Sequence, residues 1–160
     1  MRSDEKFEAS FRKPNPIDRA VNRTFGFLVG LGFGLSHNYL LQVRGRKTGR
    51  LYSTPINLLE IKGKRFLVAP RGRTQWVRNV EAANEVILKR GRTRATFRLR
   101  PIPDVEKAEI LKSYLDRFKL TVQRYFPVPA GSGSEAFVEL AAYYPVFELL
   151  PSNTRASQRS

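Results

Sequence analysis

The chain has 160 residues, the size of a single domain, and 41% of them are hydrophobic, which is enough to build a core. Its 29 Lys and Arg against 14 Asp and Glu give a formal net charge of +15 at pH 7, so it attracts polyanions. The chain has no Cys, which excludes a disulfide scaffold, a thiolate metal site and a Cys nucleophile. Its one His, His37, argues against a multi-His metal site or a Ser–His–Asp triad and is interpreted as structural. We expect no metal, and a cofactor that carries the reaction if the protein is an enzyme.

Residues 1–36 are predicted to form a basic and apolar arm. Within it, residues 25–35 are an apolar run much shorter than the roughly 20 residues that a spanning helix needs. Acidic residues near the start argue against a secretory signal, so we expect a cytoplasmic protein. The run is interpreted as a helix that packs on the domain. The alternative is a segment that lies on an anionic membrane surface at the inner face of the membrane, together with the basic residues Arg12, Lys13, Arg19 and Arg23.

From residue 39 onward, alternating apolar and polar residues predict short strands joined by Gly-containing turns. Pro55 interrupts one of them, which indicates an edge position or a bulge. The predicted strand segments are 39–44, 51–61, 65–69, 85–89, 92–100 and 144–150. They predict a mainly β (α+β) domain over residues 37–150, a small antiparallel barrel with peripheral helices, followed by a basic tail over residues 151–160.

Three short helices are predicted around the strands. Thr74, Asp104 and Ser134 are suited to cap helix N-termini, which places helices at residues 75–84, 104–118 and 134–142. Helical spacing of apolar residues indicates that Trp76 belongs to a core rather than to a substrate platform. The predicted buried faces are Trp76, Val77, Val80 and Ala83 in the first helix, and Val105, Ala108, Leu111, Leu115 and Phe118 in the second.

The segment 92–100 alternates with a period of two and carries a basic outer face. Its Arg side chains are interpreted as a solvated surface, with lipid phosphates or nucleic acid as alternative partners. Phe66 and Phe97 fall on inward-pointing positions, so the basic face lacks the exposed rings that base stacking needs. We therefore do not favour a nucleic-acid-binding module. The stripe consists of Arg92, Arg94, Arg98 and Arg100.

The densest chemical signal is the glycine-bracketed loop at residues 45–50, Gly-Arg-Lys-Thr-Gly-Arg. Glycines let backbone N–H groups approach a ligand, and guanidinium groups suit phosphate or carboxylate oxygens. The spacing is not that of a P-loop, and the loop leads into a strand rather than a helix. From charge alone, a solvated basic hairpin turn is the favoured interpretation of this loop, and a site for an anionic ligand is the alternative.

Taken together with other motifs of the chain, the loop indicates a protein family. Residues 45–50, Thr-Pro-Ile at 54–56, Leu-Val-Ala-Pro at 67–70 and Trp-Val-Arg-Asn-Val at 76–80 resemble the deazaflavin (F420)-dependent nitroreductase family over residues 39–100. The resemblance implies a split β-barrel like those of flavin reductases and pyridoxamine-phosphate oxidases. It implies coenzyme F420, an 8-hydroxy-5-deazaflavin with a phosphate and an oligoglutamate tail, in preference to FMN. The apolar arm resembles a subgroup associated with fatty acids and lipids.

The resemblance also implies a site. Phosphate and tail would be held by Arg46, Lys47, Thr48 and Arg50, and the ring would be lined by Thr54, Pro55 and Ile56. Its other side would be closed by Ala69, Pro70, Arg71 and Gly72, with support from Trp76, Arg78 and Asn79. The resemblance also implies catalytic tyrosines over the coenzyme face. Tyr143 and Tyr144 are the first candidates and Tyr114 and Tyr125 the second, because the sequence does not fix how this part of the chain aligns with the family.

The implied reaction is hydride transfer to an unsaturated apolar substrate, such as an enone, a quinone, a nitro compound or an unsaturated acyl chain. Besides the nucleic-acid-binding module, the remaining alternative to an enzyme is a lipid-binding protein without catalysis. Because small barrels often hide their edge strands by pairing, a homodimer is also expected.

Overall fold

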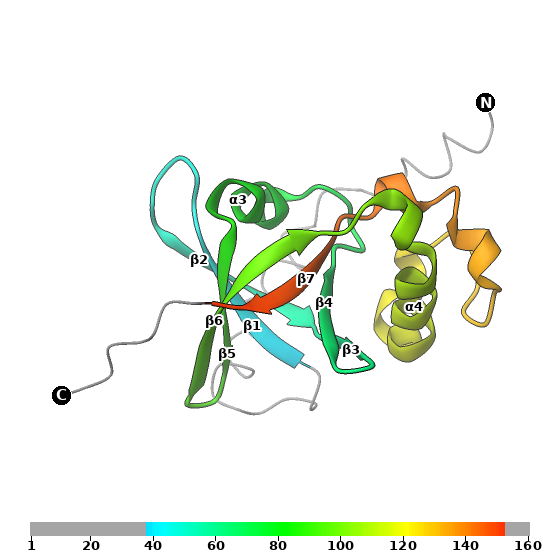
Figure 1. The fold of residues 1–160 in the computed structure, drawn as a ribbon, viewed down its shortest axis with the longest axis horizontal. Helices are drawn as coiled ribbons and strands as arrows, with labels where there is room; N and C mark the ends of the chain where they lie inside the picture. Colours follow the sequence, from blue (N-terminus) through cyan, green and yellow to red (C-terminus); the bar gives the residue numbers. More distant parts are fainter. Residues whose placement is uncertain (1–37, 153–160) are drawn as a thin grey trace.

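The computed structural model describes residues 38–152. Within this range, seven strands form one antiparallel sheet in the order β2-β1-β5-β6-β7-β4-β3 (Figure 1). The sheet curls until β2 contacts β4, so it is a partly closed, split β-barrel. The strands are β1 (Asn38–Arg44), β2 (Leu51–Asn57), β3 (Leu59–Ile61), β4 (Lys64–Val68), β5 (Glu85–Arg90), β6 (Thr93–Pro101) and β7 (Val146–Pro151).

Two α-helices lie against this sheet in the described part of the chain. Helix α3 (Gln75–Ala83) covers one end of the curl, and α4 (Ala108–Val122) lies along the half that holds β3 and β4 (Figure 1). Short 3₁₀ turns connect the remaining segments at Asp104–Glu106, Gln123–Tyr125, Ser134–Phe137 and Ala141–Tyr143. The mainly β split barrel with peripheral helices is therefore confirmed.

Alternate residues of the sheet contribute to two cores, because successive side chains of a strand point to opposite faces. The inner core lies inside the curl beneath α3 and contains Leu41, Val43, Leu58, Leu67, Ala69, Val77, Val80, Val86, Leu88, Phe97, Leu99, Phe147 and Leu149. The outer core lies between the sheet and α4 and contains Leu59, Phe66, Val68, Ile102, Ile110, Leu111, Tyr114, Leu115, Phe118, Val122, Phe126, Phe137, Tyr144 and Val146.

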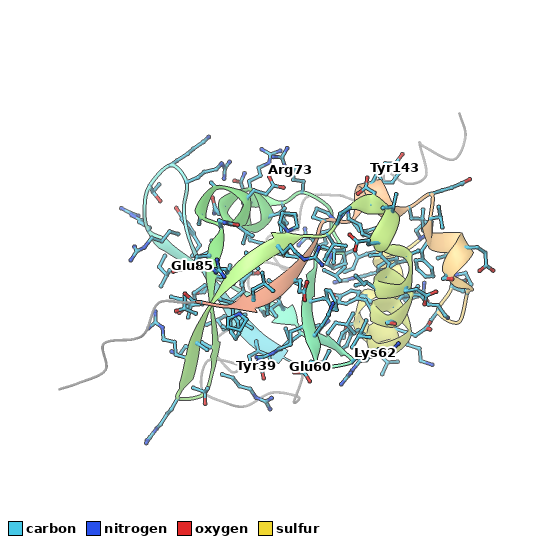
Figure 2. The ribbon with its side chains drawn as sticks, viewed as in Figure 1. Tyr39, Glu60, Lys62, Arg73, Glu85 and Tyr143 are labelled. Atoms are coloured by element: carbon cyan, nitrogen blue, oxygen red, sulfur yellow. The ribbon has the colours of Figure 1, made fainter. Side chains whose placement is uncertain are left out.

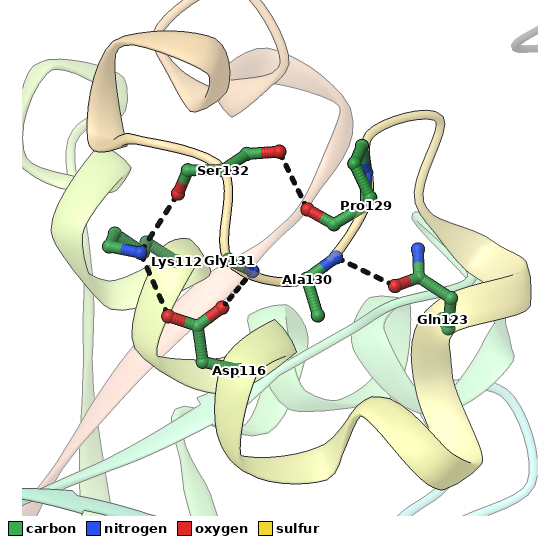
Figure 3. Close-up of polar contacts among 7 residues, drawn as sticks. All are labelled: Lys112, Asp116, Gln123, Pro129, Ala130, Gly131 and Ser132. Carbon is green, nitrogen blue, oxygen red and sulfur yellow. Dashed lines mark hydrogen bonds and ion pairs between the residues drawn. The ribbon is translucent and has the colours of Figure 1, made fainter.

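The loop at residues 127–133 is tied to α4 by a polar network (Figure 3). Lys112 Nζ donates to Asp116 Oδ2 at 2.9 Å and to the Ser132 carbonyl at 2.8 Å, and Asp116 Oδ1 accepts from Gly131 N at 2.7 Å. The Lys112 ammonium, followed by the Gly131 N–H, lowers the pKa of Asp116. Gln123 completes the network by accepting from Ala130 N at 2.8 Å. The loop is thus held as part of the fold.

Several sequence predictions about the helices were wrong in their bounds. Asp104 starts a 3₁₀ turn rather than the helix, so Val105 is exposed, and α4 itself begins at Ala108 and continues to Val122. In place of one helix over residues 134–142, the chain forms 3₁₀ turns at Ser134–Phe137 and Ala141–Tyr143. The N–H groups of Ala136, Val138 and Leu140 bond to carbonyls three residues back, which is the 3₁₀ pattern. In α3, Ala83 is exposed and Trp76 is half-buried, while Asn79 takes the buried position beside Val80.

The predictions on the arm at residues 1–36, on His37 and on residues 153–160 lie outside the described residues. Over residues 38–152, no helix combines the length and the apolar character that crossing a membrane requires. In the same range, no group of three His, Asp or Glu side chains is placed to hold a metal ion.

The outer core predicts a contrast between two leucines of α4. Leu115 is 0% exposed and Leu120 is 96% exposed. Leu115→Ala should lower the free energy of unfolding by about 2–5 kcal/mol, because it leaves a cavity against the sheet. Leu120→Ala, the same change on the same helix, should alter it by less than about 0.5 kcal/mol. Denaturant unfolding of both variants checks this. Equal losses would mean that α4 does not pack on the sheet as described.

Candidate functional site

The loop at residues 45–50 has a defined backbone. Gly45 N donates to the Arg50 carbonyl at 2.7 Å, and Gly49 N donates to the Gly45 carbonyl at 2.9 Å. Gly49 has a φ of +69°, and a Cβ at Gly45 would clash with the ring of Tyr52. The Thr48 hydroxyl accepts from Arg50 N at 3.2 Å and lies 3.1 Å from the Tyr52 hydroxyl. The loop therefore requires glycine at residue 49 and leaves no room for a side chain at Gly45 while the Tyr52 ring stays in place. The side chains of Lys47 and Arg50 are exposed.

Arg46 alone among the basic residues of this loop is tied to α3. Asn79 Oδ1 accepts from both Arg46 N, at 3.2 Å, and Arg46 Nη1, at 2.8 Å. Gln75 Oε1 also accepts from Arg46 Nη1, at 3.0 Å. Because Asn79 is only 6% exposed, these contacts fix both the loop backbone and the direction of one guanidinium group.

The turn between β4 and α3 lies next to this loop. Ala69 is buried and donates its N–H to the Pro145 carbonyl at 2.9 Å, and Gly72, with a φ of +76°, donates to the Ala69 carbonyl at 3.1 Å. Pro70 and Arg71 between them are half-buried. Thr74 precedes the first residue of α3, yet its side chain makes no capping hydrogen bond. Its Oγ1 is buried and has no partner within the described part of the chain.

A shallow, open depression of about 560 Å³ lies between the loop and α3, lined by Arg46, Arg73, Arg78, Glu81 and Ala82. Arg73 projects beside α3 (Figure 2). Its Nε and Nη2 both donate to Glu81 Oε2, at 3.0 and 2.5 Å. Three guanidinium groups against one carboxylate give the depression a positive potential, which suits an anionic ligand.

The three residues predicted to line a ring do not share a face. Thr54 and Ile56 pair with Leu41 and Tyr39 of β1 and turn toward the inner core, whereas Pro55 points to the other face. Ile56 and Trp76 are both half-buried and pack against that core. Thr54 and Ile56 therefore lie on the inner face of the edge strand β2, at the open edge of the curl, which we call the mouth of the barrel. Pro55 lies on the outer face of the same strand, and a residue without an N–H is tolerated in an edge strand.

The two tyrosines proposed as catalytic are placed differently. Tyr144 is fully buried, stacks on Phe126 with ring centroids 4.5 Å apart, and donates its hydroxyl to the Tyr125 carbonyl at 2.6 Å. Burial raises the pKa of Tyr144, and also that of Tyr114, another residue of the outer core. This placement argues against a direct role for Tyr144. Tyr143 is exposed and stays a candidate (Figure 2).

Sequence reasoning did not assign Gln75 or Glu81, although both face the site. Gln75 is four residues before Asn79, so the helical repeat puts both amides on one side of α3. That spacing is the signal in the sequence that could have identified a polar side of α3 facing the loop. Glu81 gave no such signal, because its partner Arg73 lies before the helix and its position depends on the turn.

Comparisons with known proteins agree with this fold. One solved structure, described as a domain-swapped dimer, is 19% identical over 84% of this chain and 99% of its own, with a TM-score of 0.52. HutZ, a heme storage protein from Vibrio cholerae, is 11% identical over 73% of this chain and 82% of its own, with a TM-score of 0.51. An F420-H2 dependent reductase (FDR-A) is 20% identical over 71% and 94%, with a TM-score of 0.48. At these identities the first two show a shared fold.

No curated protein matches the chain. The sequence model of the F420H(2)-dependent quinone reductases matches residues 17–124. This confirms an F420-dependent oxidoreductase, with F420H2 as the coenzyme of its family. It names quinone reductases where the sequence resemblance named nitroreductases, and it gives no support to the lipid-associated subgroup. Because the match spans more than half of the chain, this protein belongs to the F420H(2)-dependent quinone reductase family.

Proposed function

We propose that this protein uses F420H2 to reduce a small apolar quinone. The observation that carries the proposal is the pairing of a fixed basic loop with an apolar mouth of the barrel. Asn79 orients Arg46 on one side, and Ile56 and Trp76 offer half-buried apolar surface on the other. A ligand with a charged tail and a flat ring matches both parts.

The residues present fit the anionic part of such a coenzyme. A phosphate and several carboxylates need cations and hydrogen-bond donors, and Arg46, Lys47, Arg50 and Arg78 supply the cations. The orphaned hydroxyl of Thr74 lies at the start of α3, where unpaired N–H groups also favour an anion. Ala69, Pro70, Arg71 and Gly72 would border the ring on the side opposite Thr54 and Ile56.

When bound, F420H2 supplies a hydride. Reduction of a quinone to a hydroquinone takes that hydride and a proton, so the chain has to position the acceptor, exclude water and provide a proton path. Ile56 and Trp76 would exclude water at the mouth. Arg71 or Arg78 would stabilise the negative charge that develops on the quinone oxygen, and the exposed Tyr143 hydroxyl is the candidate donor. With no Cys and a single His in the sequence, no covalent protein intermediate is expected.

The other acceptors considered, enones, nitro compounds and unsaturated acyl chains, would meet the same surfaces and stay secondary candidates. A nucleic-acid module is less well supported, because Phe66 and Phe97 are both buried and cannot stack on bases. A lipid-binding protein without catalysis would need no fixed cationic loop.

Assembly and location belong to the proposal as well. The relative described as a domain-swapped dimer and the two edge strands, β2 and β3, favour a homodimer. Peripheral binding to an anionic membrane would rest on residues 1–36, which lie outside the described residues, and on the exposed arginines of β6.

The role given to Asn79 predicts a local effect. Asn79→Ala removes the acceptor of the Arg46 amide, so hydrogen exchange at that amide should speed up roughly fivefold, as expected for one lost hydrogen bond of about 1 kcal/mol. Gln75→Ala removes only a contact to the guanidinium and should leave the exchange rate of that amide unchanged. Amide exchange followed by NMR checks both variants. Unchanged protection in Asn79→Ala would contradict the proposed orientation of the loop.

The basic loop predicts tail-dependent binding. The double variant Lys47→Ala, Arg50→Ala should weaken binding of intact F420 about tenfold or more, since each exposed charged contact contributes up to about 1 kcal/mol. Binding of a tail-less ring analogue should hardly change. Fluorescence titration measures both affinities. The matched control, Lys62→Ala with Lys64→Ala, removes two exposed charges from the hairpin between β3 and β4. Equal losses for both ligands would show that residues 47 and 50 do not hold the tail.

Direct hydride transfer predicts an isotope signature. F420H2 carrying deuterium at the transferring carbon should be oxidised more slowly by a quinone, because that carbon–hydrogen bond breaks in the chemical step. With an enone, the label should remain on a carbon of the product. A quinone oxygen would instead exchange the label with water, so the rate is the readout for quinones. Consumption of FMNH2 or NADPH with no response to F420H2 would overturn the proposed function.

A further inference from the structure

The ion pair between Arg73 and Glu81 is not needed by either core or by the sheet. Arg73 lies in the turn before α3 and Glu81 lies on its exposed side, with side chains 65% and 35% exposed. Neither residue belongs to the inner or the outer core. An exposed pair of this kind adds little to stability, because solvent screens it.

The position of the pair is informative. Glu81 is the single acidic residue among those that line the depression in the described part of the chain, and the others include Arg46 and Arg78. Its carboxylate accepts from the Nε and Nη2 of Arg73, the edge of a guanidinium group that commonly binds a carboxylate or phosphate. The Glu81 carboxylate thus occupies the position on Arg73 that the carboxylate of a ligand would take.

We propose that Glu81 is a specificity residue that competes with the anionic tail of the coenzyme for Arg73. This inference rests on the proposed function. In the free protein, Glu81 occupies Arg73 and reduces the positive potential of the depression. A tail long enough to reach Arg73 exchanges with Glu81, whereas a short tail or a bare ring leaves the pair intact. Glu81 therefore sets how strongly affinity depends on tail length.

The exchange balances in charge and in hydrogen bonds. The guanidinium of Arg73 keeps a carboxylate on the same edge, and the Glu81 carboxylate returns to water, which its partial exposure allows. Because one charged contact replaces another, each exchange gains less than a new contact would. A polyanion with several carboxylates gains most, since Arg46 and Arg78 hold its neighbouring groups in the same depression.

Substitution Glu81→Gln tests the inference by binding alone. Fluorescence titrations would use F420 species with one glutamate and with several, and a ring analogue with neither phosphate nor tail, at two salt concentrations. We expect the affinity for the long tail to rise roughly two- to fivefold at low salt, the scale of one exposed charge pair. The gain should shrink for the single glutamate, vanish for the bare ring, and decrease as salt increases.

Two further variants separate the explanations. Glu85→Gln makes the same change of charge at an exposed position of β5 outside the depression, and should give no gain that depends on tail length. In an Arg73→Gln background, Glu81→Gln should lose most of its effect, because the residue for which Glu81 competes is gone. A full gain in that background would reduce Glu81 to a general repulsive charge and overturn the exchange.

Three other outcomes would each overturn the inference. If Glu81→Gln weakens binding of the long tail, Glu81 positions Arg73 for the ligand and the competition is wrong. If the wild-type protein binds F420 with a tail-length dependence that Glu81→Gln does not change, this inference fails and the proposed function stands. If the wild-type protein binds neither the coenzyme nor the ring analogue, both fail.

Discussion

The strand β7 is the constraint on which the rest of the structure depends. It pairs with both β6 and β4, and its alternate residues contribute to both cores, Phe147 inward and Val146 outward. The two halves of the sheet are joined through this strand, although it is the last strand within residues 38–152. Just before it, the Pro145 carbonyl accepts from Ala69 N, which fixes the start of the turn that leads into α3. The position of the site is therefore set by residues far along the sequence.

From that turn, one helix links core and site. Val77 and Val80 hold α3 on the inner core, and Asn79, between them, accepts from Arg46 on the basic loop. The same helix face thus buries apolar area and orients a guanidinium group 33 residues away in sequence. Lys47 and Arg50 receive no such support and stay exposed. The loop combines one oriented cation with two adaptable ones, a division that suits a ligand with one fixed anionic group and a flexible tail.

Local patterns predicted what depends on local physics. The hairpin between β3 and β4 follows from Lys62 and Gly63, whose positive φ angles of 50° and 78° match a type I′ turn, and the strands follow from alternation. The predictions failed where long-range packing decides. Ser134 resembles a helix cap, yet the chain there forms 3₁₀ turns over the outer core. The resemblance places Tyr144 over the coenzyme face, but the chain just before β7 buries it in that core. In the site, the loop was predictable from its residues, whereas Glu81 depends on a turn that the sequence does not specify.

The packing of the barrel also limits where a reaction can occur. Leu41, Leu67 and Leu88 fill the inside of the curl together with residues of β6 and β7, as in other small barrels. A ring cannot enter a space that side chains occupy at close packing. Apolar surface that is only half-buried is instead found at the edge of the inner core, at Ile56 and Trp76. Under the proposed function, the ring and its acceptor therefore meet at the mouth of the barrel, within reach of solvent and of the charged depression.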